Sequence, residues 1–75
     1  MKLSDLKINQ KAIIKNINIS NLQLKRHLME LGVITGTNIK VVNIAPMGDP
    51  ISIELRGYEL GIRKSEAKNI IVEVI

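Results

Sequence analysis

The stretch ISIELRGYELGIR, residues 51–63, constrains the fold of this chain most, because apolar residues recur at every second position on both sides of a Gly-Tyr pair. Successive side chains of a β-strand point to opposite faces, so this alternation is typical of two strands that each bury one face. The glycine predicts a two-residue hairpin turn, and we expect a type II′ turn at Gly57-Tyr58. The residues predicted to face inward are Ile51, Ile53, Leu55, Leu60 and Ile62.

Three further segments are rich in the β-branched residues that favour strands, and they span residues 12–19, 37–45 and 70–75. The second of them, residues 37–45, has apolar residues on both faces of the predicted strand, so we expect both faces to be covered. In the first, one face is predicted to hold Ile13, Ile17 and Ile19.

One segment changes period, because its leucines recur at the i, i+4 and i+7 positions of a helical face. This spacing predicts a single α-helix over about residues 21–31. Ser20 and Gln23 have the spacing of a capping box at its start, and Gly32 suits the left-handed position just beyond its end.

A chain of 75 residues has the length of one domain, and we treat residues 1–75 as a single domain. About five short strands, one α-helix and short helical turns near residues 4–6 and 65–68 indicate a mainly β fold. We expect a small barrel, because closing a sheet on itself hides the strand edges that would otherwise promote aggregation.

The composition indicates the cellular compartment of the protein. The chain has no cysteine, which excludes disulfides and thiolate metal sites and fits a reducing environment. No apolar run approaches the roughly 20 residues that span a bilayer, and the N-terminal residues lack the apolar core of a signal peptide. We therefore expect a soluble protein of the cytoplasm.

Catalysis has little support in the residues present. A catalytic serine or cysteine nucleophile needs a neighbouring base, which is usually histidine. The one histidine, His27, lies off the leucine face of the predicted helix. The seven carboxylates are dispersed, so we expect no enzyme and no bound cofactor. His27 and Glu30 are three residues apart and share a helix face, which makes them weak metal-ligand candidates, but Zn²⁺ usually takes three or four protein ligands.

The net charge of +4 is unevenly placed: residues 1–40 carry +5 and residues 41–75 carry −1. A basic half could attract nucleic acid. However, the bases of single-stranded nucleic acid stack on aromatic side chains, and Tyr58 is the only aromatic residue in the chain. Nucleic-acid binding by a small basic barrel therefore stays an alternative rather than the leading hypothesis.

The segment from Pro46 to Pro50 is the least ordinary loop, because two prolines bracket Gly48-Asp49 and fix φ at both ends. A stiff loop loses little conformational entropy when it makes a contact. Met47 within it is either a gap filler or an adaptable contact. Tyr58, at the predicted hairpin tip, has the residue type that is enriched in interface hot spots.

Three motifs together resemble the FeoA family, the small cytosolic component of bacterial ferrous iron uptake. They are the helix end L-x-E-L-G at Leu28–Gly32 followed by Gly36-Thr37, the loop A-P-x-G-D-P at Ala45–Pro50, and R-G-Y-x-L-x-[IL]-R at Arg56–Arg63. The resemblance covers nearly the whole chain. Thr35 departs from it, since the family often has proline before the Gly-Thr turn.

The resemblance implies an SH3-like barrel and a function in Fe²⁺ uptake with the membrane GTPase and permease FeoB, on its cytosolic side. It implies a protein-binding module without catalysis, whose mechanism could be docking, regulation of GTP hydrolysis or assembly. A nucleic-acid-binding barrel and an Fe²⁺ carrier or sensor are the alternatives, and the oligomeric state is open. The residues predicted to bind the partner are Leu31, Pro46, Met47, Gly48, Asp49, Pro50, Arg56 and Tyr58.

Overall fold

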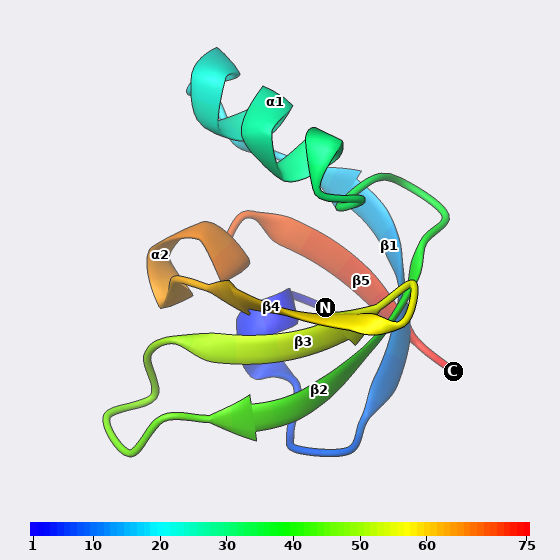
Figure 1. Cartoon of the computed structure of the whole chain (residues 1–75), viewed down its shortest axis with the longest axis vertical. Helices are drawn as coiled ribbons and strands as arrows, with labels where there is room; N and C mark the ends of the chain where they lie inside the picture. Colours follow the sequence, from blue (N-terminus) through cyan, green and yellow to red (C-terminus); the bar gives the residue numbers. More distant parts are fainter.

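A computed structural model describes residues 1–75 and contains five strands, two helices and one 3-10 turn (Figure 1). In chain order the elements are η1 (Leu3–Asp5), β1 (Lys11–Ile17), α1 (Leu22–Glu30), β2 (Asn38–Ile44), β3 (Ile51–Leu55), β4 (Tyr58–Ile62), α2 (Lys64–Ala67) and β5 (Ile70–Val74). The prediction of a mainly β fold with one longer helix and short helical turns is confirmed.

The five strands form one antiparallel sheet in the order β4-β3-β2-β1-β5. The sheet curls tightly around the interior and α1 stands at one end of it (Figure 1). The N-terminal segment extends the sheet beyond β5, because Lys2 bridges Ile71 and the Val72 N–H donates to the Met1 carbonyl at 2.7 Å. The fold is the small five-stranded barrel that the strand pattern predicts, and it agrees with the SH3-like barrel that the family resemblance implies.

The core is aliphatic throughout and forms one cluster of 17 buried residues. The β3–β4 hairpin contributes as predicted, with Ile51, Ile53, Leu55 and Ile62 buried, while Leu60 is only half-buried. Small, branched side chains from facing strands fill the barrel, so no aromatic residue is needed in the interior.

The predicted face of β1 is wrong at one position. Ile14, not Ile13, is fully buried, while Ile17 and Ile19 are buried as expected. The pairing of β1 with β5 shifts register between Ile14 and Asn16, which marks a β-bulge. An extra residue in one strand reverses the alternation of its side chains, so Ile14 and Ile17 face the core although they are three residues apart.

Helix α1 is capped by Asn21, and the predicted capping box at Ser20 is wrong. The Asn21 Oδ1 accepts a hydrogen bond from the Leu24 N–H at 3.1 Å, which satisfies one of the free amides at the helix start. The prediction at the other end is confirmed, because Gly32 has φ +98°. Leu28 is buried under the helix, and no helix in the structure is long and apolar enough to cross a membrane.

Candidate functional site

The turn of the β3–β4 hairpin has Arg56 and Gly57 at its centre, because Leu55 pairs with Tyr58. Both central residues have positive φ, +50° at Arg56 and +86° at Gly57, which defines a type I′ turn. The predicted type II′ turn at Gly57-Tyr58 is therefore wrong. Arg56 occupies the tip, and Tyr58 is the first residue of β4.

The side chain of Arg56 lies against the C-terminal end of α1. A Cβ atom placed on Gly32 would lie 3.4 Å from the Arg56 Cδ and 3.6 Å from its Nε. Gly32 is itself held by Thr37, whose hydroxyl donates to the Gly32 carbonyl at 3.2 Å in a buried position. The aliphatic part of Arg56 therefore packs against the backbone just beyond the end of α1.

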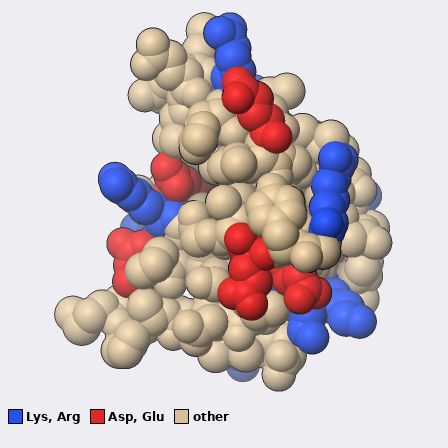
Figure 2. Space-filling view, in the orientation of Figure 1, with Lys and Arg blue, Asp and Glu red and all other residues tan.

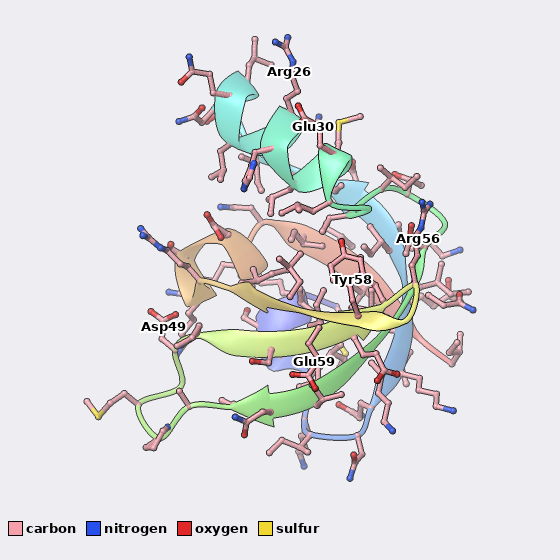
Figure 3. The ribbon with its side chains drawn as sticks, in the orientation of Figure 1. Arg26, Glu30, Asp49, Arg56, Tyr58 and Glu59 are labelled. Atoms are coloured by element: carbon pink, nitrogen blue, oxygen red, sulfur yellow. The ribbon has the colours of Figure 1, made fainter.

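Leu31 and Tyr58 lie in the same region as Arg56. Leu31 is the residue that caps the C-terminal end of α1, next to Gly32, and is half-buried. Tyr58 is 40% exposed. Figure 3 shows the Tyr58 ring rising from β4 toward the end of the molecule that carries α1, with Arg56 beside the same hairpin tip. We call Leu31, Arg56 and Tyr58 the tip surface.

The Pro46–Pro50 loop lies at the opposite end of the hairpin, where β3 begins. Met47 is 90% exposed, the highest value among the large apolar residues. The Asp49 Oδ1 accepts a hydrogen bond from the Lys64 N–H at 2.9 Å, at the first residue of α2. Asp49 therefore anchors the loop to α2, and its carboxylate has a structural partner within the chain (Figure 3).

The predicted partner-binding residues consequently fall into two groups. The tip surface and the Pro46–Pro50 loop are separated by the length of β3, which is about 13 Å for a five-residue strand. The sequence alone does not reveal this separation. The separation arises because β3 runs from the loop at one end of the hairpin to the turn at the other.

His27 and Glu30 are both exposed on α1. Figure 3 shows the Glu30 side chain on the outside of the helix, with Arg26 one turn before it. The structure contains no group of three His, Cys, Asp or Glu residues that could hold a metal ion, so these two residues have no third protein ligand beside them.

Two basic residues that the sequence did not single out meet near the hairpin tip. Lys11 of β1 lies directly opposite Lys40 of β2. They border a hollow of about 260 Å³ whose lining includes Lys11, Asn38, Lys40, Glu54, Arg56 and Gly57. We call it the cationic hollow. Only the register of the strands brings Lys11 to Lys40, so no pattern in the sequence could have indicated it.

Comparison with known proteins identifies relatives over the full length of the chain. The family model described as "FeoA domain" matches residues 1–74. An Fe(2+) transport protein A/Fe(2+) transporter FeoB fusion protein of Porphyromonas gingivalis is 33% identical over all 75 residues, and the chain spans 9% of that protein.

Solved structures of similar proteins share the fold. The solution structure of a FeoA protein from Chlorobium tepidum is 37% identical, with a TM-score of 0.93 over 100% of this chain and 70% of that one. The Stenotrophomonas maltophilia FeoA crystallised with zinc, described as an SH3 domain protein, is 29% identical, with a TM-score of 0.83 over 97% of this chain and 89% of that one.

Proposed function

Because this chain belongs to the FeoA domain family, whose members take part in Fe²⁺ transport, we propose that it is an accessory module that binds a FeoB-type permease on the cytosolic side of the membrane. In this proposal the chain contributes contacts rather than catalysis, and it acts by holding or adjusting the cytosolic part of its partner.

The observation that carries the proposal is the fusion protein of Porphyromonas gingivalis, in which a region 33% identical to this chain is joined to a FeoB transporter. Two domains on one chain stay at high effective concentration, so a fusion favours a direct contact even when that contact is weak. A separate chain with the same domain must supply that contact by its own surface.

The tip surface is the better of the two candidate regions. Arg and Tyr are residue types enriched in interface hot spots, and Tyr58 is 40% exposed on β4, the edge strand of the sheet. The Pro46–Pro50 loop contributes Met47, whose flexible thioether adapts to an irregular partner surface. Asp49 supports that loop from within through its bond to Lys64.

A retention assay tests the proposal. The purified chain is immobilised, and detergent-solubilised FeoB from the same organism is passed over it. We expect retention by the wild-type chain and at least about tenfold weaker binding by Tyr58→Ala, as for a hot-spot truncation. Val74→Ala is the matched control, because Val74 is 43% exposed and lies on β5.

The outcomes separate the two parts of the proposal. If wild type and Tyr58→Ala retain FeoB equally, the tip surface is not the contact, although the partner is correct. If a folded wild-type chain retains no FeoB, the proposed partnership itself is wrong.

A further inference from the structure

Resting on the proposed partnership for its biological occupant, we propose that the cationic hollow is a binding site for carboxylates of an acidic, extended protein segment, with Arg56 as its principal ligand. The site extends beyond the tip surface, since Arg56 lines the hollow together with residues of β1 and β2.

The backbone of Arg56 is the first observation. A residue with a side chain at φ +50° costs roughly 1–2 kcal/mol relative to ordinary backbone, and asparagine or glycine is the usual occupant of this position in a type I′ turn. Strain of this kind at an arginine indicates that the guanidinium group does something that the turn itself does not require.

The missing ion pairs are the second observation. The one salt bridge in the structure joins Lys15 to Glu73, with 3.3 Å between Nζ and Oε2. Arg56, Lys11 and Lys40 therefore have no carboxylate within ion-pair distance. Lys11 and Lys40 are directly opposite each other, which is an unfavourable like-charge cross-strand pair. Glu54 lies opposite Lys40 on its other side but is not within ion-pair distance of it.

The arrangement of the hollow favours an extended segment. The hollow around Lys11 and Lys40 adjoins a second depression along Thr35–Thr37, and Asn38 and Arg56 line both. The three cations all line the first hollow, and the second depression continues the surface beyond Arg56, so the two together are longer than a compact anion needs. Asn38 adds an amide that can bond the backbone of an extended chain, and the planar guanidinium suits bidentate pairing with a carboxylate.

The neighbouring charges favour a protein segment over nucleic acid. Lys40 lies opposite Glu54, and Glu54 lies opposite Glu59, so the row across β1 to β4 runs from two cations to two carboxylates. Figure 2 shows acidic side chains near the centre of the view and basic ones at its right edge, where Figure 3 places Arg56, with further charges of both signs at the left and top. A phosphate backbone is negative at every unit, so its part over Glu54 and Glu59 would be repelled. A peptide can place its carboxylates on the cations and uncharged or basic residues over Glu54 and Glu59.

The test is an NMR titration of the full ¹⁵N-labelled chain with a four-residue glutamate peptide. We expect saturable shifts at the amides of Lys11, Asn38, Lys40, Arg56 and Gly57, and none with a four-residue glutamine peptide. Arg56→Asn and Lys40→Gln should each weaken binding about tenfold or more, as for loss of a charged hydrogen-bond partner. Lys68→Gln, an exposed residue after α2, loses the same charge outside the hollow and should bind like wild type.

Several results would overturn the inference. Shifts spread over all lysines, or equal binding by Arg56→Asn and wild type, would mean that only net charge matters. Saturation by inorganic phosphate at the same concentrations would indicate a site for compact anions, and tighter binding of a short single-stranded DNA would indicate nucleic acid. The titration contains no FeoB, so its result stands whether or not the chain retains FeoB.

Discussion

The aliphatic stem of Arg56 lies over Gly32, close enough that a Cβ atom on Gly32 would come within 3.4 Å of the Arg56 Cδ. This contact joins the tip of the β3–β4 hairpin to the end of α1, two features that are 24 residues apart in the sequence. Because Gly32 has no side chain, the stem of Arg56 can pack directly against its backbone.

Gly32→Ala should destabilise the fold. Gly32 has φ +98°, which a residue with a Cβ atom adopts at a cost of roughly 1–2 kcal/mol. The new methyl group would lie in van der Waals contact with Arg56 and Leu55, so the loss comes from the backbone conformation. Gly61→Ala is the matched control, because its φ is not positive and nothing lies within 4 Å of its added Cβ. Urea unfolding measures both; equal midpoints for the two variants would contradict the role given to Gly32.

Arg56→Asn should stabilise the fold. Asn-Gly is the preferred pair of a type I′ turn, so the free energy of unfolding should rise by about 0.5–1 kcal/mol, which raises Tm by several degrees in a domain of this size. Thermal unfolding followed by circular dichroism measures the change. A lower Tm would mean that the Arg56 stem contributes more through its packing on Gly32 than the turn loses through strain.

Asn21→Ala should cost about 0.5–2 kcal/mol, because the Leu24 N–H at the start of α1 loses its acceptor. Ser20→Ala should change little, since Ser20 makes no capping bond to the helix. The two variants are compared by chemical denaturation under the same conditions. A larger loss of unfolding free energy for Ser20→Ala than for Asn21→Ala would mean that Ser20 caps the helix, as the sequence predicted.

Asp49→Ala should lower stability by about 0.5–1.5 kcal/mol, because it removes the acceptor of the Lys64 N–H. Asp49→Asn keeps an oxygen that can accept this bond, so it should recover most of the loss. Proteolysis of the Pro46–Pro50 loop, followed by mass spectrometry, gives a local readout; unchanged cleavage in Asp49→Ala would show that this bond does not hold the loop.

The hairpin was predictable because its signal is local. Alternation at Ile51, Ile53 and Leu55 reports directly which side chains face inward, and Gly32 reports the end of a helix whose leucines set its period. The type of turn was not predictable in the same way, because an arginine at positive φ contradicts its intrinsic preference and is held there by the surrounding structure.

Features that depend on pairing between distant strands could not be predicted. The bulge in β1 exchanges Ile13 for Ile14 in the core, and it becomes visible only where β1 pairs with β5. Likewise, Lys11 and Lys40 meet through the register of β1 and β2. The family resemblance identified Arg56 and the Pro46–Pro50 loop as candidates, but only the structure separates them to opposite ends of the hairpin.

The most direct test of the account is calorimetric titration of FeoB with wild type, Arg56→Asn and Lys68→Gln. We predict that wild type and Lys68→Gln bind alike, while Arg56→Asn binds at least about tenfold more weakly although its Tm is equal or higher. The Arg56→Asn chain would then have lost affinity for FeoB without having lost stability. Equal affinity for FeoB in all three chains would contradict the claim that Arg56 is kept in a strained turn for the partner.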